Sequence, residues 1–119
     1  MRILVVEDDR AIAALIADAL EDEIGARATV LHDGAEAIAY LAGHTVHLAI
    51  LDYQLPGATG LAIYDAMASY SHMSRTPVLF VTANSERAEF QERDVHYVRK
   101  PFDLGEFLAA VESSLTARE

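Results

Sequence analysis

Carboxylates stand at two points of the chain where an unbroken apolar run ends. Glu7, Asp8 and Asp9 follow the run ILVV, and Asp52 follows the run HLAIL. Runs of this kind are typical of strands that a parallel sheet buries on both faces. Carboxylates that meet in a partly desolvated place repel each other, and their pKa values rise unless something positive lies among them. The pattern therefore indicates a cation site, or chemistry on one of these carboxylates.

The cation that suits these ligands is a hard one, because the cluster offers oxygen and neither His nor Cys. A small number of carboxylates with open positions suits Mg²⁺ better than Ca²⁺, which needs a fuller cage, and Mn²⁺ would also serve. Two simpler roles compete with metal binding. The acids after ILVV could cap a following helix, which we expect to be the main role of Asp9, and Asp52 could form a turn with its own backbone.

Five short apolar runs predict the strands that place these residues. The runs lie at residues 3–6, 28–31, 47–51, 77–81 and 96–98. Helical patterns separate them, with apolar residues at helical spacing from Ile12 to Leu20 and from Leu104 to Leu115, and with further helices expected over residues 34–42 and 59–70. The segment TANSERAEFQERDV is mostly polar, so its helix should be short or loosely held.

Strand and helix alternate five times, which is typical of an α/β fold with a doubly wound, open parallel sheet. We see no linker, repeat or domain boundary, so residues 1–119 are expected to form a single domain. Ligands of such sheets bind outside the carboxyl ends of the strands. Thr82 comes at the end of the fourth predicted strand and Lys100 at the end of the fifth, so both should meet the acids at this edge.

Composition narrows the function classes. The 119 residues include no cysteine, which excludes disulfides, thiolate metal sites and cysteine nucleophiles. A net charge of −10 opposes direct binding to nucleic acid. No segment approaches the length of a membrane span or a signal peptide, so we expect a cytoplasmic protein without a membrane partner. The five histidines lack partners at ligand spacing near the acids, and we expect them to be solvated or capping residues.

Four motifs in order resemble the receiver domain of bacterial two-component response regulators. They are ILVVEDD, LAILDYQLPGATG, VLFVTA and YVRKPF, and together they cover the whole chain. The resemblance implies a flavodoxin-like fold with strand order 2-1-3-4-5. It also implies that Asp52 accepts a phosphoryl group from a sensor histidine kinase or a histidine phosphotransfer protein. No separate effector is expected in the chain, so output would pass through a partner protein.

The same resemblance implies a Mg²⁺ site. Asp8 would bind the ion directly and Glu7 through water, while Asp52 and the backbone carbonyl of Gln54 would complete the ligands that the protein supplies. Lys100 would pair with Asp52 before phosphorylation and with a phosphoryl oxygen afterwards.

The resemblance further implies how the signal is transmitted. The hydroxyl of Thr82 and the backbone N–H of Ala83 would bind the phosphoryl group, and Tyr97 would turn inward. The side-chain amides of Gln54 and Asn84 would influence how fast water hydrolyses the acyl phosphate. The resemblance implies a signalling domain and not an enzyme, with no activity beyond self-catalysed phosphotransfer and dephosphorylation.

The sequence departs from the family in one region. Only fourteen residues separate Thr82 from Tyr97, and RDVH replaces the small Gly-Ala pair that commonly precedes the aromatic residue. We therefore expect a shortened helix 4 and a remodelled output face, which makes the usual symmetric dimer through this face doubtful.

Three alternatives compete with a phosphorylated receiver. A phosphatase with an aspartate nucleophile needs a second acid two residues on, where this chain has Gln54. A flavodoxin-like cofactor module needs a phosphate-cradling loop after the first strand, where this chain has EDDRA. The alternative that remains is a receiver that works unphosphorylated as an interaction domain.

Overall fold

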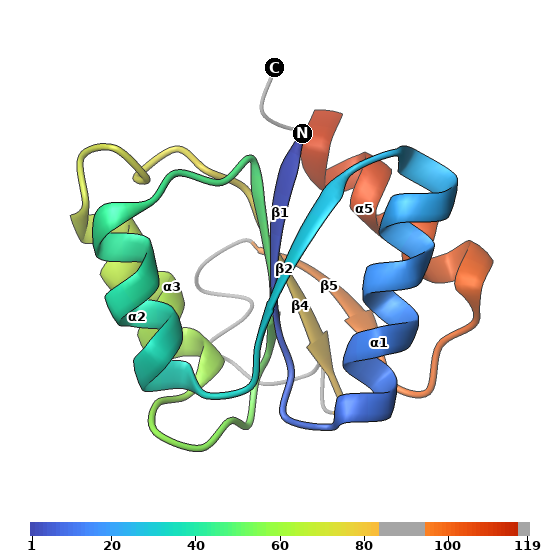
Figure 1. The fold of residues 1–119 in the computed structure, drawn as a ribbon, viewed down its shortest axis with the longest axis horizontal. Coiled ribbons are helices and arrows are strands. Elements are labelled where there is room, and N and C mark those ends of the chain that lie inside the picture. The colour runs from blue at the N-terminus through green and yellow to red at the C-terminus, as the bar shows by residue number, and fades with distance from the viewer. Residues whose placement is uncertain (84–94, 117–119) are drawn as a thin grey trace.

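The computed structural model describes residues 1–83 and 95–116. Within them, five parallel strands form one sheet in the order β2-β1-β3-β4-β5 (Figure 1). The strands are β1 (Arg2–Val6), β2 (Arg27–Leu31), β3 (Leu48–Asp52), β4 (Val78–Thr82) and β5 (His96–Arg99). The predicted α/β fold and the strand order 2-1-3-4-5 are confirmed.

Helices cover both faces of the sheet. They are α1 (Arg10–Ala19), α2 (Gly34–Gly43), α3 (Gly60–Ser69) and α5 (Leu104–Thr116), and the π-helical turn η1 (Leu20–Ile24) continues α1. Figure 1 shows α2 and α3 on one face and α1 and α5 on the other. All four α-helices lie within one to three residues of their predicted positions, whereas the π turn was not predicted.

Side chains fix where three of these helices begin. Asp9, Asp33 and Thr59 are the N-cap residues of α1, α2 and α3, and each accepts a hydrogen bond from a backbone N–H three residues later. A cap of this kind satisfies one of the donors that the first turn leaves free. The predicted capping role of Asp9 is confirmed.

The core has two layers because successive residues of a strand point to opposite faces. Ile3 and Val5 pack in the layer beneath α1 and α5, whereas Leu4 and Val6 pack in the layer beneath α2 and α3. All five residues of β3 are buried, since this strand lies at the centre of the sheet. Asp52 is the last of them, so a carboxylate is held at the end of a fully buried strand.

Two strands begin one residue later than predicted. β3 begins at Leu48, after the exposed His47, and β4 begins at Val78 because Pro77 has no N–H for the ladder. The shortened helix expected between β4 and β5 falls on residues 84–94, outside the described residues. None of the helices in the described part of the chain is long and apolar enough to cross a membrane.

Candidate functional site

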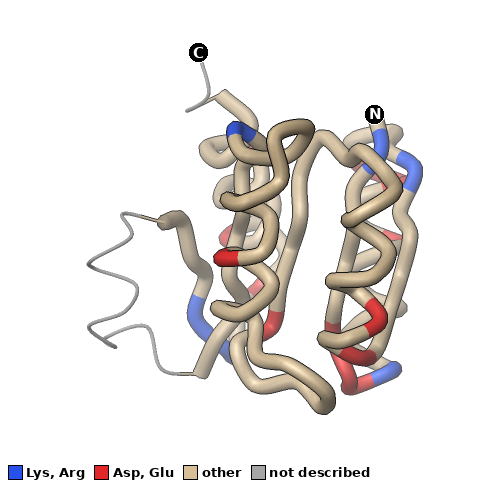
Figure 2. The backbone as a smooth tube through the Cα atoms, turned by 90° about the vertical axis from the view of Figure 1, so that its left-hand side faces the viewer, with Lys and Arg blue, Asp and Glu red and all other residues tan. Residues whose placement is uncertain are grey.

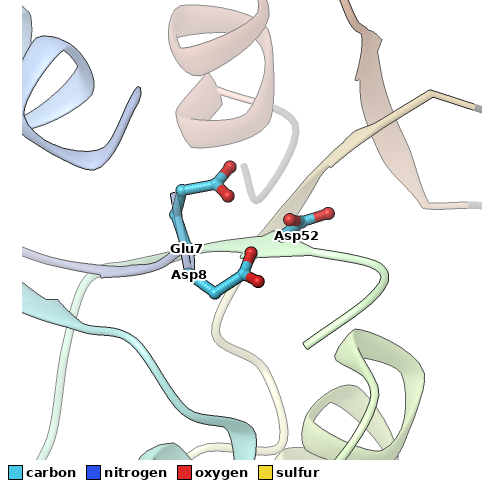
Figure 3. A group of neighbouring side chains, drawn as sticks. All are labelled: Glu7, Asp8 and Asp52. Carbon is cyan, nitrogen blue, oxygen red and sulfur yellow. The ribbon is translucent and has the colours of Figure 1, made fainter. Parts of the chain in front are cut away.

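Three carboxylates meet at the carboxyl ends of the central strands. Glu7 and Asp8 follow β1, and Asp52 ends β3 beside it. Each offers one carboxylate oxygen, and these oxygens lie within 4.8 Å of one another (Figure 3). Glu7 and Asp52 are buried, with 2% and 8% of their surface exposed, while Asp8 is exposed to solvent. The cluster predicted from the sequence is therefore present, with one member open to the outside.

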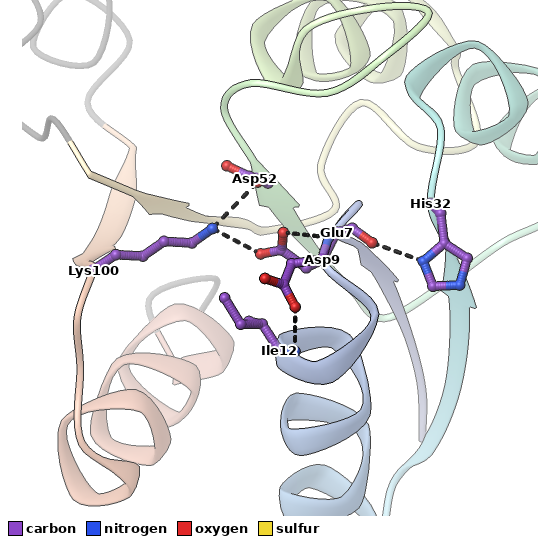
Figure 4. A network of polar contacts seen from close by, with 6 residues as sticks. All are labelled: Glu7, Asp9, Ile12, His32, Asp52 and Lys100. Atoms are coloured by element: carbon purple, nitrogen blue, oxygen red, sulfur yellow. Dashed lines mark hydrogen bonds and ion pairs between the residues drawn. The ribbon is translucent and has the colours of Figure 1, made fainter.

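Lys100 lies between two of these acids. Its Nζ is 2.9 Å from Oε1 of Glu7 and 3.3 Å from Oδ2 of Asp52 (Figure 4). The backbone N–H of Lys100 donates to the carbonyl of Thr82, and the Lys100–Pro101 peptide bond is cis. The pairing with Asp52 was expected, whereas the shorter contact with Glu7 was not.

The shared lysine leaves a surplus of negative charge. Burial raises the pKa of Glu7 from its ordinary 4.5 to about 7, although Lys100 and the N–H of Asp9 act against this rise. Burial lowers the pKa of Lys100, but its contacts with Glu7 and Asp52 outweigh burial and hold it above its ordinary value. One ammonium thus serves two buried carboxylates.

The residues present fit a hard divalent cation. The contact between Lys100 and Oε1 of Glu7 does not have hydrogen-bond geometry, so this buried oxygen has no aligned donor. Glu7, Asp8 and Asp52 contribute oxygen only, which is the ligand type that Mg²⁺ and Mn²⁺ prefer. A cation there would stabilise charges that Lys100 alone cannot neutralise.

A hollow of about 650 Å³ opens above this cluster. Its lining includes Asp8, Asp52, Gln54, Thr82, Ala83 and Lys100. The structure therefore gathers the predicted acceptor, the lysine, the hydroxyl residue and its neighbour around one space. Tyr97 is not among the lining residues, and 48% of its surface is exposed on β5. Asn84 lies outside the described residues.

Asp9 does not belong to the cluster. Its Oδ1 accepts from the N–H of Ile12, and its own N–H donates to Oε2 of Glu7 (Figure 4). His32 is a neighbour that the sequence did not reveal, because it is 25 residues away along the chain. Its Nδ1 donates to the backbone carbonyl of Glu7 at 2.8 Å. The backbone of Glu7 is thereby held by His32, just after β2, and its side chain by the N–H of Asp9, the N-cap residue of α1.

The loop after Asp52 is held by the turn before α2. The N–H of Gly34 donates to the carbonyl of Pro56 at 2.8 Å, and a Cβ atom at position 34 would collide with the backbone oxygen of Ala58. Gly57 has φ +84°, and a Cβ atom there would collide with the carboxylate of Asp33. From the sequence, Asp33-Gly34 indicated a helix start only. The structure shows that these two residues also position the loop that carries Gln54.

Comparison with known proteins identifies the family of the chain. The family model of the response regulator receiver domain matches residues 3–112. The chain is 35% identical over 117 residues to the uncharacterized transcriptional regulatory protein YkoG of Bacillus subtilis, covering 95% of this chain and 50% of that protein. It is 32% identical over 116 residues to the DNA-binding transcriptional regulator NtrC of Escherichia coli, covering 94% of this chain and 24% of that protein.

The chain thus spans about half the length of the first relative and about a quarter of the second. Among solved structures, the chemotaxis response regulator CheY4 of Vibrio cholerae superposes with a TM-score of 0.87 at 26% identity, over 96% of this chain and 98% of that one.

Proposed function

This chain belongs to the response regulator receiver domain family, and we propose that it is a phosphorylation switch whose acceptor is Asp52. A receiver domain is a signalling domain rather than a classical enzyme. The observation that carries the proposal is the position of the Lys100 ammonium, 3.3 Å from a buried carboxylate that opens into a hollow. A carboxylate in this place is accessible to a phosphoryl donor and is already paired with a cation.

The transfer needs one bond to form and one to break. A carboxylate oxygen of Asp52 attacks the phosphorus of a phosphohistidine, the P–N bond breaks, and the freed imidazole takes up a proton. The product is an acyl phosphate. Catalysis of phosphoryl transfer depends mainly on positioning and charge stabilisation. Lys100 supplies part of that stabilisation, and the buried ends of β1 and β3 supply the positioning.

We propose that Mg²⁺ is the cofactor, with Mn²⁺ as a substitute. Glu7, Asp8, Asp52 and the backbone carbonyl of Gln54 would hold it. When bound, the ion would offset the negative charge of the phosphoryl oxygens. The support is the set of carboxylate oxygens within 4.8 Å of one another and the exposure of Asp8, which gives the ion access from solvent.

Residues at the end of β4 and on β5 would respond to the new phosphoryl group. It adds nearly two negative charges and three acceptor oxygens. We propose that the hydroxyl of Thr82 and the N–H of Ala83 bind it beside Lys100, and that Tyr97 changes from its half-exposed position to an inward one. The support for this proposal is that Thr82 and Ala83 line the same hollow as Asp52.

The phosphodonor would be a sensor histidine kinase or a histidine phosphotransfer protein, and the output would be a protein–protein contact. Relatives of the chain are named as transcriptional and DNA-binding regulators. The net charge of −10 opposes direct contact of this domain with DNA, so we place any such contact outside it.

Intact mass measured after incubation with acetyl phosphate and Mg²⁺ tests the proposal. The wild type is expected to gain one phosphoryl mass, and both omission of Mg²⁺ and Asp52→Asn should remove the gain. Asp65→Asn, an exposed acid on α3, is the matched control and should leave the gain unchanged. If folded wild type gains no phosphoryl mass from acetyl phosphate or from a phosphohistidine donor, the proposal is wrong. The alternative, a receiver that works unphosphorylated as an interaction domain, would then be favoured.

A further inference from the structure

A second hollow lies at the amino ends of the strands, on the edge of the sheet away from Asp52. Its volume is about 520 Å³, and Arg2, Arg27, Thr45 and His47 contribute to its lining. We call it the amino-end hollow. Nothing in the phosphorylation scheme uses it, although basic residues lie beside the N-terminus at this end of the molecule (Figure 2), and those that line the hollow are Arg2 and Arg27.

The sheet register places three of these side chains in one row. Arg2 is the direct partner of Arg27 in the parallel ladder, and the N–H of His47 donates to the carbonyl of Arg2. Residues that are partners in a ladder point to the same face. Since Leu4 and Ala49 lie in the layer beneath α2 and α3, the alternation puts the row on that face. Three neighbouring strands, β2, β1 and β3, therefore present a line of nitrogen groups.

Arg2 and Arg27 are exposed cations that lie directly opposite each other on β1 and β2. Like charges directly opposite each other on neighbouring strands are destabilising. Within residues 1–83 and 95–116, neither Arg2 nor Arg27 has an ion-pair partner, and no carboxylate is among the residues that line the hollow.

The side chains that line the amino-end hollow offer mainly hydrogen-bond donors. The Nδ1 of His47 accepts from the N–H of Arg2 at 3.0 Å, so the ring proton is on Nε2. That nitrogen is therefore a donor, as are the two guanidinium groups, and Thr45 adds a hydroxyl. Arg2 and Arg27 extend from neighbouring strands and line the same hollow, and guanidinium groups bind phosphate oxygens through paired hydrogen bonds.

We propose that the amino-end hollow binds the phosphate group of a small soluble phosphomonoester. Two forks and a neutral imidazole match a dianion with several acceptor oxygens better than they match a single carboxylate. The net charge of −10 repels extended polyanions such as nucleic acid or an anionic membrane, whereas a small dianion is opposed far less. The ligand is therefore small, and its phosphate is the part that the row recognises.

Backbone amide chemical shifts test this proposal when inorganic phosphate is added at constant ionic strength. Amides at residues 2, 27, 45 and 47 are expected to shift and to saturate in the millimolar range. Arg2→Gln and Arg27→Gln should each weaken the fitted affinity about tenfold, which is the effect of losing one charge-assisted contact. Acetate at the same ionic strength should give no saturation at these amides.

Arg75→Gln is the matched control, because Arg75 is exposed and does not line the amino-end hollow. Shifts that rise linearly without saturation would overturn the proposal, as would an equal loss of affinity in the control. Vesicles of phosphatidylglycerol distinguish a lipid source of the phosphate. Binding to vesicles without binding to inorganic phosphate would also overturn it. Phosphate bound near Asp52 would shift other amides, so this test does not depend on the phosphorylation scheme.

Discussion

The two sides of the phosphorylation site differ in how firmly they are held. On one side, β3 has all five residues buried, Asp52 pairs with Val81 of β4, and the loop after Asp52 is held by the turn before α2. On the other side, β5 has a single buried residue, Val98, and Tyr97 is half exposed at the edge of the sheet. Phosphoryl transfer requires fixed atoms, whereas a signal requires an element with two positions. The buried central strand β3 meets the first requirement, and the more exposed edge strand β5 meets the second.

The largest effect should follow the loss of the cation that the buried carboxylates of Glu7 and Asp52 share. Lys100→Ala leaves Glu7 and Asp52 buried without their shared partner, and the phosphorylation rate should fall about a hundredfold, as it does where one charge-stabilising group is removed. Arg99→Ala changes an exposed cation of the same strand and is the control. Intact mass followed over time measures both. Equal rates for wild type and Lys100→Ala would contradict the role given to the lysine.

A smaller effect should follow a change in the support of the loop. Gly34→Ala forces the turn before α2 away from Ala58 and shifts the loop that carries Gln54, so we expect the rate to fall about tenfold or more. Gly43→Ala, in the same helix, meets no atom within 4 Å and should leave the rate unchanged. Melting temperatures separate loss of fold from loss of rate. An equal loss of rate in Gly43→Ala would contradict the claim that support of the loop by Gly34 sets the phosphorylation rate.

The buried charge of Glu7 predicts a dependence of stability on pH. Because its pKa rises from 4.5 to about 7 on folding, the folded state holds a proton between these values that the unfolded state has lost. The contribution of Glu7 to stability therefore falls as the pH rises through this window. Above pH 7, Glu7→Gln should raise the melting temperature of the metal-free protein by roughly 5 °C.

Below about pH 4.5 this advantage should vanish, since Glu7 is then neutral in both states. Mg²⁺ should narrow the difference above pH 7 by stabilising the wild type. Glu112→Gln, an exposed acid on α5, is the control. A melting temperature of Glu7→Gln below that of the wild type at pH 8 would show that the Lys100 contact outweighs burial.

The smallest effect on chemistry is expected on the open side. Tyr97→Ala removes an exposed ring that does not line the hollow, so the phosphorylation rate should stay within about twofold of wild type. What Tyr97→Ala should lose is the conformational change that follows phosphorylation. Phosphorylation should change the amide spectrum of β5 and α5 less in Tyr97→Ala than in Tyr97→Phe, which retains the ring. A large fall in the rate itself would show that the two sides are not separate.

Much of this arrangement could be predicted from local signals. The buried run before Asp52 predicts a central strand, and the helical spacing from Ile12 to Leu20 predicts α1. Because the carboxyl ends of parallel strands share one edge, the meeting of Asp52 with Lys100 followed from topology. The family motifs then assigned a role to each residue.

Other features depend on contacts that no local pattern encodes. The hydrogen bonds from His32 to Glu7 and from Gly34 to Pro56 join residues that are far apart in the sequence. The exposure of Tyr97 depends on its place on an edge strand, and the charged row in the amino-end hollow depends on sheet register. The π turn after α1 ends at Gly25, whose left-handed φ of 74° closes it, but its polar sequence gave no sign of the wider turn.

The site of the phosphoryl group tests the central claim most directly. Borohydride reduces an acyl phosphate to a primary alcohol and releases phosphate, so peptide mass mapping after reduction identifies the acceptor. The account predicts a single reduced residue at position 52, obtained only after phosphorylation in the presence of Mg²⁺. Reduction at Asp8 or Asp9, or a stable phosphoryl group on a histidine with Asp52 unchanged, would contradict it.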